Sequence, residues 1–225
     1  MNCAEILKRM ELAADPAAVA GMARYGITAK KVYGLSTPAL KKMAREIGKD
    51  HALAQQLWDT KILEARGLAG LVDEPDRVSE RQMERWVKDF DSWAVCDGTC
   101  LNLFRKTPFA HRKCREWSSR PEEFVKRGGF TLMACLAVHD QGAADGTFLA
   151  CLPLIQREAA DERNFVKKAV NWALRQIGKR NRRLNRAATK AAEAIQRLDS
   201  RSARWIAADA LRELRSQAVQ RRLKG

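Results

Sequence analysis

The residues best suited to chemistry lie in the stretch from Trp86 to Asp97. Read as one continuous helix, this stretch places four side chains on a single face, at i, i+4, i+7 and i+11: Trp86, Phe90, Trp93 and Asp97. An ionised carboxylate on a core-facing position costs on the order of several kcal/mol unless it is paired or reaches water. Two interpretations follow for this stripe of four side chains. In the first, the stripe breaks near Asp91 and Ser92, the aromatics belong to the core, and Asp97 lies near a helix end. In the second, Asp97 faces a polar cleft beside Trp93.

A carboxylate beside an indole in a polar cleft has a definite chemistry. The carboxylate attracts a positive charge that develops in a substrate, and it accepts a hydrogen bond from an attacking water. The indole face adds cation–π stabilisation of about 0.5–2 kcal/mol. This stretch therefore indicates a hydrolytic reaction with a cationic transition state, provided that Asp97 is accessible.

The rest of the sequence predicts an all-helical chain that positions this stretch. Apolar residues make up 46% and charged residues 31% of the 225 residues, and runs of β-branched residues are nearly absent. Capping signals and apolar periodicity predict roughly a dozen helices joined by short turns. We expect them over 2–13, 16–25, 37–47, 50–58, 61–72, from 79 into the central stretch, 92–105, from 121 to a loop at 140–147, 148–157, 161–177, 180–198 and 200–223.

Local signals mark where several of these helices begin and bend. Asp15 and Thr37 each precede a proline at the first helical position, and Asp50 is a further N-cap. Ser79 and Gln82 have the spacing of a capping box. The pair at 128–129 places two glycines inside a helix at a propensity cost of about 2 kcal/mol, which indicates a close approach or a bend.

Antiparallel helix pairs with short turns are typical of an α-solenoid of HEAT-like repeats. No change in composition marks a linker. We therefore expect one right-handed solenoid domain over residues 1–225, with a concave basic groove that suits a DNA duplex.

The positive charge is concentrated in the last third of the chain. Residues 157–225 hold 19 Lys/Arg and 7 Asp/Glu, a net charge of +12, whereas residues 1–156 hold 23 and 20, a net charge of +3. Such a local excess favours a polyanionic partner, nucleic acid first and an anionic membrane second, over a merely solubilising surface. A membrane-surface protein would need an apolar stripe free for lipid, and the stripes here are needed for helix packing.

A second row of side chains lies in this basic third. In the helix at 161–177, Val166, Val170 and Ile177 belong to the apolar stripe that faces the core. Four residues at i, i+4, i+7 and i+11 follow another face: Lys168, Trp172, Arg175 and Lys179. A tryptophan among cations is typical of a surface that neutralises phosphates and presents an apolar plate to a sugar or base. The alternative is a Trp172 packed on an adjacent helix between solvated cations.

The six cysteines do not form a metal site. Cys96 and Cys100 are four residues apart, the three histidines are scattered, and there is no Cys-x-x-Cys. No secretory signal precedes them and no apolar run approaches ~18 residues, so we expect a cytoplasmic protein with reduced, buried thiols and no membrane span. Neither a Gly-x-Gly-x-x-Gly nor a Walker lysine loop occurs, and we expect no cofactor.

Three segments together resemble the AlkD-like DNA alkylation repair enzymes, a family of HEAT-like repeat DNA glycosylases. They are Leu57-Trp58 with Glu64-Ala65-Arg66-Gly67-Leu68-Ala69, Trp93-x-x-x-Asp97, and Phe165-Val166-Lys167-Lys168-Ala169-Val170-x-Trp172-x-Leu174-Arg175. The resemblance runs from about residue 34 to about residue 178. It implies a helical solenoid that hydrolyses the N-glycosidic bond of cationic alkylated purines, such as 3-methyladenine and 7-methylguanine, without drawing the lesion into a base pocket.

The resemblance also assigns roles to residues of this chain. It implies that Asp97 is the catalytic carboxylate, that Trp93 and Trp172 flank the deoxyribose of the lesion, and that Arg127 is an additional active-site arginine. The expected DNA-binding residues are Tyr33, Lys168, Arg175, Lys179, Arg180, Arg182 and Arg183, and Tyr25 is a further candidate.

A cationic purine leaves as a neutral base and needs no general acid, and no lysine is indicated as a Schiff-base nucleophile. We therefore expect a monofunctional, monomeric glycosylase acting on double-stranded DNA with alkylated bases. The alternative is a non-catalytic HEAT-like scaffold that recognises distorted DNA or RNA, in which Asp97 is only a helix-end residue.

Overall fold

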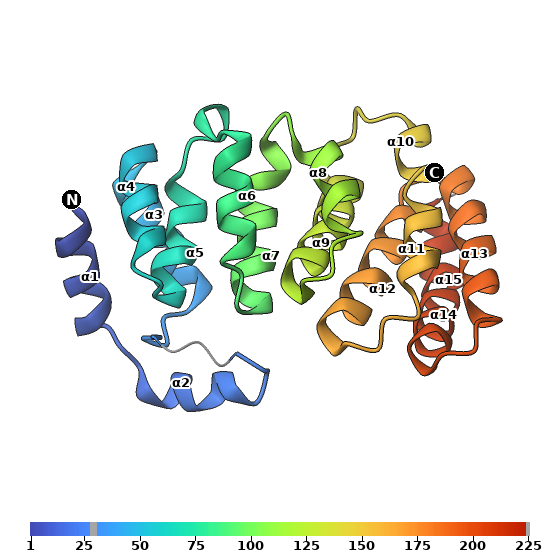
Figure 1. Cartoon of the computed structure of the whole chain (residues 1–225), viewed down its shortest axis with the longest axis horizontal. Helices are drawn as coiled ribbons and strands as arrows, with labels where there is room; N and C mark the ends of the chain where they lie inside the picture. Colours follow the sequence, from blue (N-terminus) through green and yellow to red (C-terminus); the bar gives the residue numbers. More distant parts are fainter. Residues whose placement is uncertain (28–30, 224–225) are drawn as a thin grey trace. The chain divides into compact units, whose positions relative to one another are not determined.

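The computed structural model describes residues 1–27 and 31–223, and every regular element in these ranges is a helix (Figure 1). Lys30, part of the expected connector before the third helix, lies outside the described residues. The chain divides into two compact units, residues 1–107 and residues 108–225. Each unit is built from helices packed pairwise, which confirms the predicted all-α class.

The first unit is organised around its fifth helix, α5, which packs against α3, α4 and α7. Its α-helices are α1 (Cys3–Leu12), α2 (Pro16–Ala23), α3 (Thr37–Ile47), α4 (His51–Asp59), α5 (Leu63–Val72), α6 (Glu80–Lys88) and α7 (Trp93–Asn102). Two 3₁₀ turns, η1 (Pro75–Arg77) and η2 (Phe104–Lys106), complete it.

Most expected N-caps in this unit are confirmed. The side chains of Asp15, Asp50 and Ser79 accept hydrogen bonds from the first backbone N–H groups of α2, α4 and α6. The cap of α3 is Ser36, one residue before the expected Thr37, because its hydroxyl accepts from the N–H of Ala39. Only half of the expected capping box forms at α6, since the Gln82 side chain donates to Asp73 instead.

A buried carboxylate on α5 fixes the loop that enters α3. Glu64 is only 1% exposed, and its two oxygens accept from the N–H groups of Tyr33 at 3.0 Å, Gly34 at 2.7 Å and Leu35 at 3.3 Å. Gly34 has a φ of 84°, and a Cβ there would lie 2.4 Å from the carbonyl oxygen of Asp15. The loop therefore requires glycine at this position and a charged acceptor beneath it.

A buried guanidinium on the same helix fixes the loop that enters α7. Arg66 is 4% exposed and lies 5.1 Å from the ring centroid of Trp58. Its Nη1 donates to the carbonyl of Asp89 at 3.0 Å and to the carboxylate of Asp91 at 3.4 Å. The indole N–H of Trp58 donates to the Asp89 carboxylate at 2.9 Å. These bonds satisfy a charge that is otherwise costly to bury, and they hold the chain immediately before α7.

The second unit places α9, α12 and α14 side by side, with α8 packed on α9 and α13 packed on both α12 and α14. Its helices are α8 (Ala110–Trp117), α9 (Glu123–His139), α10 (Asp145–Leu149), α11 (Leu152–Glu158), α12 (Asn164–Gly178), α13 (Arg182–Gln196), α14 (Arg201–Leu214) and α15 (Gln217–Arg222). The sequence did not predict α8. The single helix expected over 200–223 is two helices, because Ser216 caps α15.

The glycine pair inside α9 has a steric reason at its second member. A Cβ at Gly129 would lie 2.4 Å from the backbone nitrogen of Ser118 and 2.9 Å from the carbonyl oxygen of Cys114. The end of α8 therefore lies directly on α9, as the expected close approach requires. The six cysteines all lie within the described residues and form no disulfide there; five are buried and Cys3 is half-buried.

Replacing Glu64 by glutamine tests the anchoring of the loop at 33–35. Glutamine keeps the volume but offers one neutral oxygen to three N–H groups, so we expect the free energy of unfolding to fall by about 2 kcal/mol. Urea denaturation would measure it. The matched control is Glu11→Gln on the exposed end of α1, which should change stability by less than about 0.5 kcal/mol. Equal effects of the two substitutions would contradict this role of Glu64.

Candidate functional site

The aromatic stripe of the central stretch breaks before its carboxylate. Trp86 and Phe90 are core residues, and the Trp86 ring stacks on that of Trp58 with centroids 3.9 Å apart. Helix α6 ends at Lys88, and α7 begins at Trp93 after the Ser92 hydroxyl caps it. The predicted break of the stripe near Asp91 and Ser92 is therefore confirmed. Asp97, however, lies inside α7 and not at a helix end.

Trp93 and Asp97 are neighbours on the accessible side of α7, one turn apart. The opposite side of α7, with Thr99, is buried against α5. Trp93 and Asp97 are both half-buried, and a Cβ added at Gly98 would meet no atom within 4 Å. The carboxylate and the indole are therefore both partly accessible, and the surface at the neighbouring Gly98 is open.

The N-terminal segment contributes the partner of Trp93. The indole N–H of Trp93 donates to the backbone carbonyl of Tyr25 at 2.8 Å, while the Tyr25 side chain is 74% exposed. This bond orients the indole and holds the backbone of Tyr25 beside Trp93. Tyr33 is half-buried, and its pKa is raised by burial and by the nearby carboxylates of Glu11 and Glu64.

In the second unit, Arg127 and Trp172 lie on the tightly packed helices α9 and α12. Arg127 is 6% exposed, and its Nη1 donates to the carbonyl of Phe165 at 2.6 Å. Trp172 is half-buried on α12. Arg127 therefore joins α9 to the start of the helix that carries Trp172, and much of its side chain is structural.

The basic row on α12 is less uniform than its spacing predicted. Lys168 is exposed and has no salt bridge within the described residues. Arg175 and Lys179 both bind Glu213 of α14, at 2.5 Å and 2.6 Å, and Arg175 also lies 3.6 Å from Asp209. Two of the three predicted cations therefore have carboxylate partners within the unit, so they add less positive field at the surface than the sequence indicated.

Glu213 is ionised in this arrangement. Burial by itself raises the pKa of Glu213, but hydrogen bonds from Lys179 and Arg175 outweigh it, so the pKa lies below its usual value. A lowered pKa means that the carboxylate stabilises the fold above its usual pKa, and that this contribution is lost as the pH falls through the lowered value.

The three arginines that follow α12 have different environments. Arg180 donates to the carbonyl of Ala137 at 2.7 Å and lies 4.2 Å from the ring centroid of Phe148, so its guanidinium is held within the unit. Arg182 is exposed and donates to the carbonyl of Leu223 at 3.0 Å. Arg183 is exposed, and no salt bridge reaches it in the described part of the chain.

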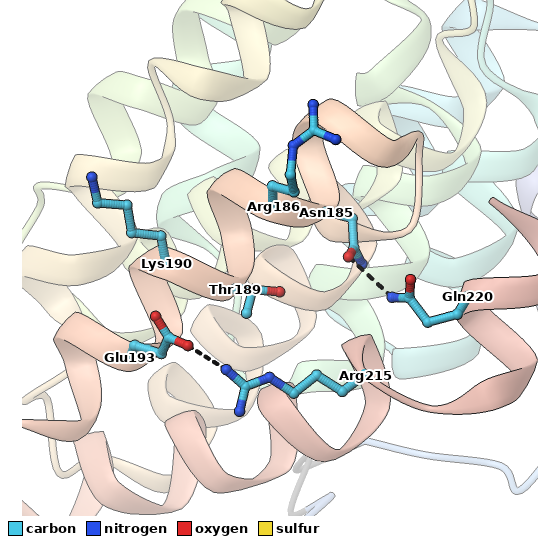
Figure 2. A pocket seen from close by; sticks show the side chains of 7 residues that line it. All are labelled: Asn185, Arg186, Thr189, Lys190, Glu193, Arg215 and Gln220. Atoms are coloured by element: carbon cyan, nitrogen blue, oxygen red, sulfur yellow. Dashed lines mark hydrogen bonds and ion pairs between the residues drawn. The ribbon is translucent and has the colours of Figure 1, made fainter. Parts of the chain in front are cut away.

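The structure also reveals basic residues that the sequence reasoning missed. An open pocket of about 550 Å³ between α13 and α15 is shown in Figure 2. Its lining consists of Asn185, Arg186, Thr189, Lys190, Glu193, Arg215 and Gln220. Arg186 and Lys190 are exposed, whereas Arg215 binds Glu193. The i, i+4 spacing from Arg182 through Arg186 to Lys190 was the signal that could have found this face.

Among residues 1–27 and 31–223, no group of three His, Cys, Asp or Glu side chains could hold a metal ion. In the same ranges no helix is long and apolar enough to cross a membrane.

The sequence model of the DNA alkylation repair enzymes matches residues 6–218. The chain belongs to this family. A solved structure matches this chain with 18% sequence identity and a TM-score of 0.79, and the match covers 95% of this chain and 96% of the matched chain. That protein is described as belonging to a new family related to the HEAT-like repeat DNA glycosylases, with affinity for branched DNA structures. A designed armadillo repeat protein has 15% identity and a TM-score of 0.36, over 79% of this chain and 92% of its own. No curated protein matches the chain.

Membership of the DNA alkylation repair enzyme family confirms the resemblance seen in the sequence. The matched residues include Trp93, Asp97, Arg127 and Trp172. The similar solved structure confirms the HEAT-like repeat fold over nearly the whole chain.

Replacing Glu213 by glutamine tests the ion pairs behind the basic row. We expect the free energy of unfolding at pH 7 to fall by about 1–2 kcal/mol, because two cations lose their charged partner. The loss should shrink as the pH falls through the lowered pKa of Glu213, because the wild-type carboxylate then becomes protonated as well. Urea denaturation from pH 3 to pH 7 would measure both effects. Glu193→Gln, at the exposed pair with Arg215, is the control and should cost less than about 0.5 kcal/mol. A pH-independent difference would contradict the role of the charge.

Proposed function

We propose that this protein is a monofunctional DNA glycosylase that releases cationic alkylated purines, such as 3-methyladenine and 7-methylguanine, from duplex DNA. The observation that carries the proposal is the pairing of Trp93 and Asp97 on the accessible side of α7. In a member of the DNA alkylation repair enzyme family, an accessible carboxylate one helical turn from an oriented indole is suited to this hydrolysis.

The chemistry requires little more than these groups. An N3- or N7-alkylated purine carries a positive charge and leaves as a neutral base when the N-glycosidic bond breaks. Asp97 stabilises the oxocarbenium-like sugar and accepts a hydrogen bond from the attacking water. The water adds to the anomeric carbon and gives up a proton to the Asp97 carboxylate, which returns it to solvent. By family resemblance alone, Trp93 and Trp172 are assigned as aromatic faces for the deoxyribose, and Arg127 is assigned as an additional active-site arginine.

The binding of DNA is assigned mainly to the second unit. Lys168, Arg182 and Arg183 are exposed, and they belong to the third of the chain that carries a net charge of +12. Cations at such positions neutralise phosphates and release counterions. Arg175, Lys179 and Tyr33 remain candidates, the first two in competition with Glu213. The protein acts as a monomer on double-stranded DNA.

Replacing Asp97 by asparagine tests the catalytic assignment. The variant keeps the shape but loses the charge, so we expect release of methylated purines from methylated duplex DNA to fall about 100-fold or more. Binding to the same duplex should stay within about threefold. Chromatography of the released bases and a parallel binding assay would measure the two effects.

The matched control is Asp76→Asn, which neutralises an exposed aspartate of η1 and should leave release unchanged. Full release by the Asp97 variant would refute the catalytic role.

A second candidate function is binding of branched or distorted DNA without chemistry. The similar solved structure, whose family is described as having affinity for branched DNA structures, favours it, and the basic second unit suits it equally well. Under this alternative, wild type and the Asp97 variant both bind DNA and neither releases a base from any methylated duplex. The same experiment therefore separates the two functions.

Replacing Lys168 by alanine tests the DNA-binding face of α12. Loss of one phosphate contact should weaken duplex binding about three- to fivefold at low salt and reduce the slope of log K against log salt by about 1. The control is Lys8→Ala, which removes the same charge from α1 and should leave the slope unchanged. An identical slope in wild type and the Lys168 variant would place this face away from the DNA.

A further inference from the structure

The second unit exposes a tryptophan that the proposed function does not use. Of the six tryptophans, all within the described residues, three are fully buried, Trp93 and Trp172 are half-buried, and Trp205 alone is exposed, at 42%. Trp205 lies on α14, whose opposite face, including Ile206 and Ala210, is buried. An exposed indole offers an aromatic face and an N–H group that a ligand can contact, and its neighbours decide which ligand fits.

Regularly spaced side-chain hydrogen bonds join α12 and its N-terminal approach to α14 and its N-cap, and they fix the position of Trp205. The partners are 38 residues apart in each of the pairs Glu162–Ser200, Asn171–Asp209 and Arg175–Glu213. Lys167 and Trp205 are also 38 residues apart and lie between the first two pairs, with the Lys167 ammonium 5.2 Å from the Trp205 ring centroid. These contacts therefore hold the indole in place without burying it.

The surroundings of Trp205 repeat the pattern of the row on α12. Four residues of α14 at i, i+4, i+7 and i+11 are all exposed: Arg201, Trp205, Ala208 and Arg212. Lys168, Trp172, Arg175 and Lys179 have the same spacing on α12. Arg201 and Lys167 have no salt bridge within the described residues, whereas Arg212 binds Asp209. Two adjacent helices of one unit thus each carry a tryptophan among cations.

We propose that Trp205 stacks with an unpaired base of a DNA strand whose phosphates are neutralised by Lys167 and Arg201. A base within a duplex presents no free π-face, so the ligand is a single-stranded segment, such as one at a gap or branch. Base–aromatic stacking tolerates any sequence and is worth about 1–3 kcal/mol per base. The charged neighbours of Trp205 leave no continuous apolar patch for lipid. This inference rests on the DNA-binding part of the proposed function and not on base release.

Single-stranded oligothymidylate is the probe, with its binding followed by anisotropy of a label on the DNA. We expect Trp205→Leu to weaken binding about tenfold and Trp205→Phe, which keeps an aromatic face, to stay within about threefold of wild type. Affinity for a blunt duplex should change less than twofold. The matched control is Leu198→Ala. Leu198 is another exposed apolar residue of the second unit, at 39%, and its removal should leave binding of oligothymidylate unchanged.

Intrinsic fluorescence supplies a signal that a structural role would not move. Stacking on a base quenches indole emission, so bound oligothymidylate should quench the wild type clearly more than the Trp205→Phe protein, which still binds and keeps the other five indoles. Equal quenching of the two proteins, or equal oligothymidylate affinity of wild type and Trp205→Leu, would overturn the inference. Trp205-dependent binding to phosphatidylserine vesicles without binding to oligothymidylate would overturn it in favour of a membrane surface.

The failure of this inference is distinguishable from that of the proposed function. If the wild type binds methylated duplex and releases bases while the Trp205 variants bind oligothymidylate normally, only the role of Trp205 is refuted. If the wild type binds neither duplex nor single strand, both fail together.

Discussion

The structure of the first unit depends on two opposite charges buried on one helix. Glu64 and Arg66 lie two residues apart on α5, and each is satisfied by the backbone of a different loop. A buried charge is tolerated only with its full set of partners, so the loops cannot leave without a large free-energy cost. The loop held by Arg66 is the one that enters α7. The accessible Trp93–Asp97 pair is thus positioned by a charge that lies in the core.

The sequence predicted most of the fold because its signals were local. Side-chain caps at Asp15, Asp50 and Ser79 lie at the starts of their helices, and no strand was expected. Helix α8 was missed because no side chain caps it. The break between α14 and α15 was missed because Ser216 lies within an otherwise continuous helical pattern. Gly129 was noticed as a cost, but its reason lies in α8, a segment that the sequence reasoning had not assigned to any helix.

The candidate site was predictable in its residues but not in its electrostatics. Spacing alone placed Trp93 and Asp97 together, and family resemblance supplied their roles. The same kind of spacing made Arg175 and Lys179 look available for phosphate, whereas Glu213, far along the chain, binds both. A pattern within one helix cannot report which carboxylates a neighbouring helix contributes. For the same reason Trp205 was not recognised, since its basic surroundings come partly from Lys167 on another helix.

The burial of the cysteines has a consequence for a protein of a DNA alkylation repair family. Agents that alkylate purines also attack thiolates, which are soft and strongly nucleophilic, and an alkylated core cysteine would add volume that the packing cannot accommodate. Five of the six thiols are buried. The remaining one, Cys3, is half-buried, and burial raises the pKa of its thiol. The chain thus presents little accessible sulfur to the chemicals that create its proposed substrates.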